Sequence, residues 1–167
     1  MTVRRCLPWP DKRLRTAAAE VGEITDEIRA IWQDMIDTME AMPGVGLAAP
    51  QIGVMLRLAV VDGSLERGRA VRLANPEIID ASTELRDHTE ASPNLPGVSA
   101  ALKRPRVVLV RYLDQNGMIN RREFSDLEST SVQHQIDHLN GQMYFDRLSK
   151  VKRDVLLRKA RKAAKGG

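Results

Sequence analysis

The order of hydrophobic patterns along this chain constrains its fold more than any other feature. Residues 26–41 carry apolar side chains at helical spacing, and Thr25 is a suitable N-cap before two acidic residues in the first turn. Pro43 and Gly44 then end the pattern. The apolar face predicted for this helix consists of Ile28, Ile31, Trp32, Met35, Ile36 and Met39.

Several β-like segments follow this helix. The segments predicted as strands are Leu56–Val61, Arg69–Leu73, Ile78–Ile79 with its flanks, Arg106–Leu113 and Met118–Phe124. The sequence Asp-Gln-Asn-Gly at 114–117 predicts a hairpin turn between the last two strands. Residues 44–53 and 92–97 are rich in small residues, proline or glycine, which is typical of loops.

Two further helices are predicted after the strands. The first covers about Glu128–Leu139 and ends at Asn140-Gly141. The second covers about Lys150–Ala164. Its predicted inward-facing residues are Val151, Val155, Leu156 and Ala160. A helix, a series of antiparallel strands and then helices indicate an α+β fold.

Length and composition exclude several classes of protein. The chain has 167 residues, which suits one domain with a hydrophobic core. No apolar run approaches the ~20 residues of a membrane span, so we expect no membrane partner. Arg4 and Arg5 are not followed by the apolar stretch of a secretory signal. The one cysteine, Cys6, excludes a disulfide scaffold and a multi-cysteine zinc site, and it suits the reducing cytoplasm, which is the predicted location.

Positive charge concentrates at the C-terminal end. The whole chain carries 26 Lys and Arg against 22 Asp and Glu, a net charge of +4. Residues 150–167 hold eight basic residues and one acid, so this segment is +7 and the rest of the chain is −3. Such a body is not typical of a general nucleic-acid binder. The basic tail fits either an anionic surface such as RNA or a simple solvated helix.

The strongest chemical signal is a pair of histidines in the predicted helix 128–139. His134 and His138 lie four residues apart, so a helix places both imidazoles on one face, where they can bind one metal ion. In zinc and iron hydrolases with this spacing, a glutamate after the first histidine accepts a proton from metal-bound water. Here that position is Gln135, whose amide cannot accept the proton at physiological pH.

A third protein ligand is not obvious from the sequence. Cys6 lies at the far end of the chain and is better explained as a small core residue or an exposed thiol. His88 lies in a charged stretch, Arg-Asp-His-Thr-Glu at 86–90, which favours a solvated role.

Four segments resemble motifs of the peptide deformylase family. GVGLAAPQ at 44–51 is similar to the first motif, GxGLAAxQ, and QHQIDHLNG at 133–141 is similar to the third motif, QHExDHLxG. EASPN at 90–94 stands where the family has EGCLS, before a matching Pro-Gly-Val at 96–98. WPDKRLR at 9–15 resembles the family's N-terminal PDxxLR stretch.

The resemblance implies a fold and a domain organisation. We expect short antiparallel strands packed around a central helix that carries His134 and His138, with an N-terminal helix and a C-terminal helix. The similarity reaches to about residue 148. It therefore predicts a deformylase-like domain over residues 1–148 and a basic C-terminal helix over residues 149–167 of the same domain.

The resemblance also implies a reaction. Peptide deformylases remove the formyl group from N-formylmethionine at the start of new proteins. One cysteine and two histidines hold a divalent metal, usually ferrous iron, and the glutamate of the third motif is the general acid and base. The glutamine of the first motif and the backbone N–H after the cysteine stabilise the formyl oxygen.

Three of these roles fall on residues that cannot perform them here. The metal ligands map to His134, His138 and Ser92, and a neutral serine hydroxyl is a poor substitute for a thiolate. The catalytic glutamate maps to Gln135. The oxyanion N–H maps to Pro93, which has none.

Other positions of the site are retained. The oxyanion glutamine maps to Gln51, which is kept. Val45, Gly46 and Pro93 map to the substrate-binding wall, so N-terminal methionine peptides are candidate partners.

The sequence thus predicts a catalytically degenerate deformylase homologue, inactive or severely impaired. No tightly bound metal is expected, and any that binds would be a divalent ion such as Fe²⁺, Zn²⁺ or Ni²⁺. Two alternatives stay open. One is an active metallo-hydrolase that uses a substituted ligand such as Glu90, and the other is a ribosome- or RNA-associated protein that binds through residues 150–167.

Overall fold

The computed structural model describes residues 2–166. Met1 and Gly167, which belong to the predicted domain and tail, lie outside the described residues. The helices are α1 (Asp26–Ala41), α2 (Asp126–Leu139) and α3 (Lys150–Gly166), with short 3-10 helices η1 (Lys12–Arg15), η2 (Ala49–Ile52) and η3 (Tyr144–Arg147). The strands are β1 (Gly46–Ala48), β2 (Leu58–Val61), β3 (Val71–Ala81), β4 (Leu85–Ser92), β5 (Leu95–Pro105), β6 (Val107–Leu113) and β7 (Ile119–Ser125).

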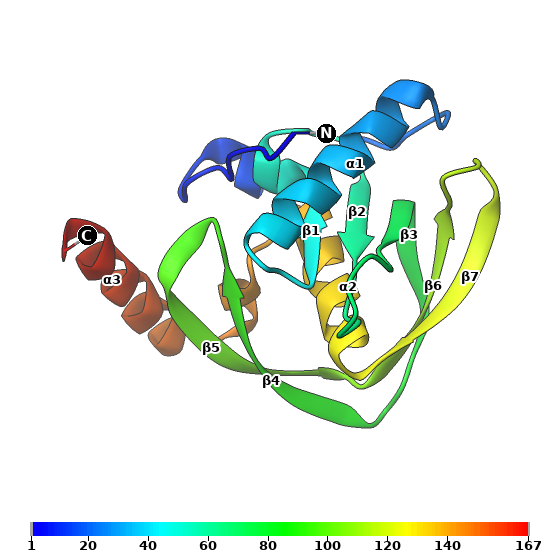
Figure 1. Cartoon of the computed structure of the whole chain (residues 1–167). Helices are drawn as coiled ribbons and strands as arrows, with labels where there is room; N and C mark the ends of the chain where they lie inside the picture. Colours follow the sequence, from blue (N-terminus) through cyan, green and yellow to red (C-terminus); the bar gives the residue numbers. More distant parts are fainter. Residues whose placement is uncertain (1, 167) are drawn as a thin grey trace.

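A five-stranded antiparallel sheet in the order β1-β2-β3-β6-β7 separates α1 from α2 (Figure 1). All four residues of β2 are buried. Successive side chains of a strand point to opposite faces of the sheet, so this pattern requires that both faces are covered. Leu58 and Val60 pack in the core beneath α1, whereas Ala59 and Val61 pack in the core beneath α2. The sheet is therefore covered on both faces, and the α+β prediction is confirmed.

Helix α1 has the bounds that the sequence predicts. The Thr25 hydroxyl accepts a hydrogen bond from the backbone N–H of Ile28 at 3.3 Å, as an N-cap should. Trp32, Met35 and Met39 are fully buried, and of the predicted apolar face only Ile31 is partly exposed. The helical spacing of apolar residues thus identified the side of α1 that packs against the sheet.

Helix α2 lies at the centre of the molecule. Every residue from Ser129 to Leu139 is buried, including the polar ones, because the sheet, β5 and η2 all pack against this helix. The helix begins two residues earlier than predicted, at Asp126, and ends at Leu139 as predicted. Gly141 has a φ of +75°, and a Cβ there would lie 2.8 Å from the Arg15 backbone, so glycine is required after the helix.

The hairpin of β4 and β5 was not predicted from the sequence. Residues 86–90 are strongly charged and were interpreted as a solvated stretch, but they form most of β4, which pairs with β5 in a two-stranded sheet. Glu90 and Ser92 are buried on this strand, and Pro93-Asn94 form the turn that follows. Residues 44–53, interpreted as a loop, contain β1 and η2. The β6–β7 hairpin turn at 114–117 is confirmed.

Helix α3 packs against β5 at the edge of the molecule, far from the five-stranded sheet (Figure 1). Leu156 and Ala160 face inward as predicted. The prediction was wrong for Val151, which is 74% exposed, and for Val155, which is 37% exposed, because a helix supported on one side buries only a narrow stripe. Within residues 2–166, no helix combines the length and apolar character needed to cross a bilayer.

The contact between α1 and the sheet yields a stability prediction. Trp32 is fully buried, and its indole N–H donates to the Leu73 carbonyl at 3.3 Å. Trp32→Ala should lower the free energy of unfolding by about 3–5 kcal/mol, measured by urea denaturation. Ile31→Ala is the matched control on the same helix and should cost about 1 kcal/mol, because its side chain is only partly buried. Equal effects of the two variants would contradict this packing.

Candidate functional site

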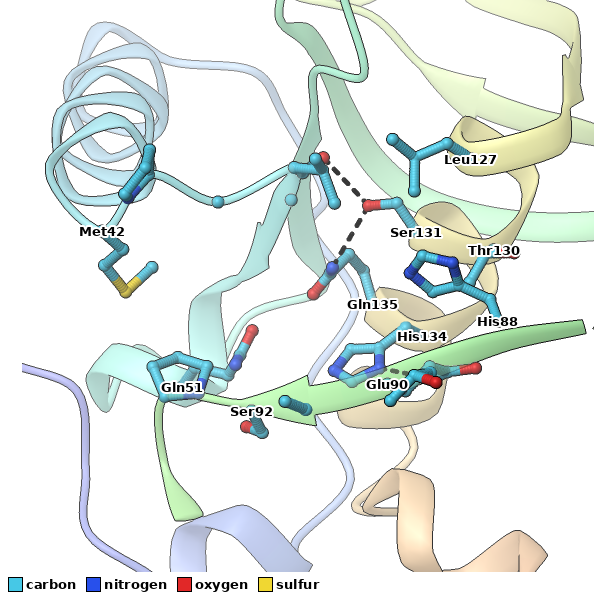
Figure 2. Close-up of a pocket in the computed structure, with 17 residues that line it drawn as sticks. Met42, Gln51, His88, Glu90, Ser92, Leu127, Thr130, Ser131, His134 and Gln135 are labelled. Atoms are coloured by element: carbon cyan, nitrogen blue, oxygen red, sulfur yellow. Dashed lines mark hydrogen bonds and ion pairs between the residues drawn. The ribbon is translucent and has the colours of Figure 1, made fainter. Parts of the chain in front are cut away.

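A cavity of about 430 Å³ lies between β1, β4 and α2 (Figure 2). Strands β1 and β4 each border it with an edge that has no partner strand among residues 2–166, since β1 ends one sheet and β4 belongs to a two-stranded one. The cavity contains most of the site residues predicted from the sequence. Its lining includes Val45, Gly46, Gln51, Glu90, Ser92, Pro93, His134 and Gln135.

The two histidines converge as their spacing predicted. The Nε2 atoms of His134 and His138 are 3.2 Å apart on adjacent turns of α2, and both residues are buried. Burial, together with the nearby His134 and Arg104, lowers the pKa of His138 well below its usual value, so this imidazole is neutral. The ring of Tyr144 stacks on His134 with 6.0 Å between ring centroids.

Charged side chains, of which the sequence analysis named only Glu90, hold His134 in place. Its Nδ1 lies 2.8 Å from Glu90 Oε1, and Arg104 donates to both oxygens of Glu90, at 2.6 and 2.9 Å. Arg104 also donates to Asp137 at 3.0 Å, and Asp137 in turn accepts two hydrogen bonds from Arg147. Two carboxylates and two guanidinium groups therefore alternate, so the buried charges are paired.

The position of Glu90 bears on the alternative of a substituted metal ligand. Burial alone raises the pKa of Glu90, but the hydrogen bonds from His134 and Arg104 outweigh it and lower that pKa to about 2. The carboxylate faces Nδ1 of His134, and both of its oxygens are already bound. It therefore orients the imidazole rather than offering a third ligand beside the Nε2 atoms, and the alternative that uses Glu90 has no support.

Ser92, at the family's cysteine position, belongs to a hydrogen-bonded cluster with Asn94 and Gln51. The Ser92 hydroxyl donates to Asn94 Oδ1 at 3.1 Å, and Gln51 Nε2 donates to the same oxygen at 2.8 Å. Asn94 Nδ2 donates to the backbone carbonyls of Leu7 and Gln51. Asn94 thus joins the turn, η2 and the N-terminal segment. The sequence analysis gave it no role.

Gln135 sits in a close contact that depends on Gly46. Its Nε2 donates to the Ser131 hydroxyl at 3.4 Å, and that hydroxyl donates to the Val45 carbonyl at 3.0 Å. A Cβ on residue 46 would lie 2.3 Å from Ser131 Oγ and 2.5 Å from Gln135 Nε2, so any larger residue there would have to displace these two side chains. The Oε1 atom of Gln135 is buried without a hydrogen-bond partner among residues 2–166.

The remaining candidates occupy less central positions. His88 lies on β4, half-buried, and borders the cavity, so it is less solvated than its charged neighbours indicated. Cys6 is half-buried against the core beneath α1, with its Sγ 3.9 Å from the Met42 sulfur, and burial raises the pKa of its thiol. Among residues 2–166, neither side chain forms a group with the histidine pair that could hold a metal ion.

Comparisons with known proteins agree with this geometry. The family model described as "Polypeptide deformylase" matches residues 3–154. The chain belongs to the polypeptide deformylase family. A peptide deformylase of Afipia carboxidovorans is 40% identical over 167 residues, covering 99% of this chain and 98% of the relative. One of Methylocella silvestris is 41% identical, covering 99% of this chain and 87% of the relative.

Solved structures of the family show the same fold. A peptide deformylase from Ehrlichia chaffeensis has a TM-score of 0.91 to this chain at 34% identity, covering 99% of this chain and 98% of that one. One from Legionella pneumophila also has a TM-score of 0.91, at 36% identity, covering 98% of this chain and 96% of that one. The deformylase-like fold predicted from the sequence is confirmed.

The family's metal does not fit the donor atoms of this site. Two imidazoles converge, but Ser92 at the third position is a neutral hydroxyl that already donates to Asn94. Protein ligands of divalent iron and zinc are thiolates, imidazoles and carboxylates, and a neutral hydroxyl is a poor substitute for them. Within residues 2–166, no three His, Cys, Asp or Glu side chains come together as a possible metal site. In this part of the chain, the two histidines therefore have no anionic side chain beside them that could act as a third ligand.

The buried carboxylate of Glu90 predicts how the stability of the fold depends on pH. The pKa of Glu90 is about 2 in the folded chain against the usual 4.5. The ionised carboxylate therefore stabilises the fold in full above pH 4.5, and this contribution is lost as the pH falls toward 2. Glu90→Gln should lower the unfolding free energy at pH 7 by about 3–5 kcal/mol, because Arg104 loses its charged partner. Urea denaturation from pH 7 to pH 2.5 should show this difference shrinking below pH 4.5. The exposed Glu84→Gln is the control and should show no such trend.

Proposed function

We propose that this chain is a deformylase homologue that binds the N-terminal end of methionine-type peptides and does not hydrolyse a formyl group. One observation carries the proposal. The cavity and the histidine pair are intact, whereas Ser92, Pro93 and Gln135 occupy the positions of the family's metal-binding cysteine, oxyanion N–H donor and catalytic glutamate.

The shape of the cavity supports binding of a peptide end. An extended peptide fits between the unpaired edges of β1 and β4, because each edge presents backbone groups to a third strand. Part of the wall is apolar and suits an unbranched apolar side chain. This part is formed by Met42 and Leu127, which Figure 2 labels, and by Val45. The family similarity over residues 3–154 agrees with a site for methionine at this position.

The chemistry of the replacements opposes hydrolysis. Gln135 cannot take a proton from water, and the loss of a general base costs about 10²–10⁴ in rate. Pro93 has no N–H to stabilise the oxyanion, and the loss of one such donor costs about 10²–10³. These factors need not multiply. The missing thiolate weakens metal retention as well, so any divalent metal would bind loosely here.

Restoring the family's residues should restore the reaction. We expect the unchanged chain to release little formate from formyl-Met-Ala-Ser and to retain less than one metal ion per chain. The triple variant Ser92→Cys, Pro93→Leu and Gln135→Glu should raise formate release at least about 100-fold. It should also purify with about one divalent ion by elemental analysis.

A matched control separates restoration from a general effect of substitution. The variant Pro93→Leu alone leaves Ser92 and Gln135 unchanged, and it should stay as inactive as the original chain. Stoichiometric metal and rapid formate release by the unchanged chain would contradict the proposal. Calorimetric titration with Met-Ala-Ser and its formylated form tests binding directly, and no heat with either peptide at millimolar concentration would overturn it.

A second candidate function, ribosome association, rests on α3. Outside the narrow stripe of Leu156 and Ala160, most of this helix is exposed, and residues 150–167 carry a net charge of +7. We propose that this surface contacts ribosomal RNA, with affinity that falls steeply with salt because phosphate contacts release counterions.

Co-sedimentation with purified ribosomes tests the second candidate. We expect binding in 50 mM salt and loss of binding in 500 mM salt. The double variant Lys159→Gln and Lys162→Gln should bind more weakly, since both side chains are exposed on α3. The control Lys12→Gln changes an exposed lysine in η1, away from α3, and should bind normally. Equal binding by all three proteins at both salt concentrations would contradict the proposal.

A further inference from the structure

The cavity wall holds a hydrogen-bond acceptor that has no donor, and it has one donor fewer than the family's site. Gln135 is 4% exposed, and its Oε1 has no partner among residues 2–166. Figure 2 shows this oxygen turned away from Ser131 toward the centre of the cavity. The Ser131 hydroxyl uses its one hydrogen on the Val45 carbonyl and can only accept from Gln135, which fixes the amide with Nε2 toward Ser131.

The donors that a formyl oxygen would need are reduced in number. Pro93 has no backbone N–H to offer. Gln51 accepts a hydrogen bond from the Ala48 N–H through Oε1, and its Nε2 donates to Asn94 Oδ1 at 2.8 Å. One of the two N–H bonds of that amide is therefore occupied. The Ser92 hydroxyl donates its one hydrogen to Asn94 Oδ1, and its oxygen accepts from the Asn94 backbone N–H at 3.3 Å, so it offers no donor to a formyl oxygen.

The charged residues of the cavity wall also favour a ligand with a cationic end. Among the residues that line the cavity, Glu90 carries a formal charge and no lysine or arginine is present. Arg104, which pairs with Glu90, is 1% exposed and lies behind the wall. A cationic end group in the cavity would thus meet the unpaired Gln135 carbonyl oxygen, and no lysine or arginine side chain lines the wall to repel it.

We infer that this cavity takes peptides whose N-terminus is a free α-ammonium group, in preference to N-formylated peptides. An ammonium has three N–H donors and no acceptor, so it can donate to the unpaired oxygen of Gln135 and needs no donor from the wall. A formamide has one N–H and a carbonyl oxygen that needs the donors this site has lost. The inference rests on the proposed function, because it names the end group of the peptide that the same cavity binds.

In this view Gln135 sets the specificity of the site. Its unpaired Oε1 is the acceptor placed to receive an N–H of the ammonium, whereas a carboxylate at the same position serves the family as a proton carrier. Filling a buried acceptor with a charged donor is favourable, and leaving it empty beside a bound ligand is not.

The test compares matched peptides on the intact chain. Isothermal titration at pH 6.5 uses Met-Ala-Ser, formyl-Met-Ala-Ser and acetyl-Met-Ala-Ser, because an α-amino group with a pKa of about 7.7–8.0 is protonated there. We expect the free peptide to bind at least about tenfold tighter than the formylated one. Gln135→Met, which keeps the length of the side chain, should remove most of this preference by weakening the free peptide.

A reciprocal variant keeps the test independent of any folding defect at position 135. Pro93→Leu restores a backbone N–H and should tighten binding of the formylated peptide by a larger factor than binding of the free peptide. Thermal unfolding of each variant checks that it is folded. Equal or tighter binding of the formylated peptide by the unchanged chain would overturn the inference and leave the proposed function standing. No binding of any of the three peptides would overturn both.

Discussion

The buried ion pair between Glu90 and Arg104 attaches the hairpin of β4 and β5 to helix α2. Glu90 lies on β4 and Arg104 on β5, and together they reach His134 and Asp137 on α2. A buried charge without a partner is costly, so each member of this chain of contacts requires the others. The two-stranded sheet is thereby fixed against the central helix, and the cavity takes its shape from that attachment.

The same contacts explain how the histidines are positioned although three family residues around them differ. His134 is oriented through Nδ1 by Glu90, and its Nε2 lies 3.2 Å from the Nε2 of His138. Ser92 and Gln135, which stand at the family's cysteine and glutamate positions, contact other partners. The side chains that hold the histidines are therefore different from the ones that depart from the family's motifs.

Much of the fold could be predicted from the sequence, and the exceptions have physical reasons. Helix α1 was predicted to the residue because an amphipathic face and an N-cap are local signals. Strand β4 was missed because its buried polar residues break the alternation of apolar and polar side chains, and only the tertiary partner Arg104 shows why Glu90 is inside. Val151 and Val155 were misplaced because local spacing does not reveal how many sides of a helix are covered.

The candidate site could be predicted in part. His134, His138, Gln51 and Gln135 were singled out by spacing and by motif, and Gln51, His134 and Gln135 line the cavity while His138 lies beside His134. Arg104 was not singled out because it belongs to none of the motifs and its partners are distant in sequence. Asn94 stands in one of the motifs, but its contacts with Gln51 and Leu7 are long-range, so the sequence did not reveal its role.

The cluster around Asn94 has a consequence for engineering of this cavity. The Asn94 amide binds Ser92, Gln51 and the N-terminal segment at once. A substitution at residue 92 therefore acts beyond its own side chain, because it changes a bond to an amide that also holds Gln51 and the N-terminal segment. Redesign of this corner has to treat residues 51, 92 and 94 as one cooperative unit.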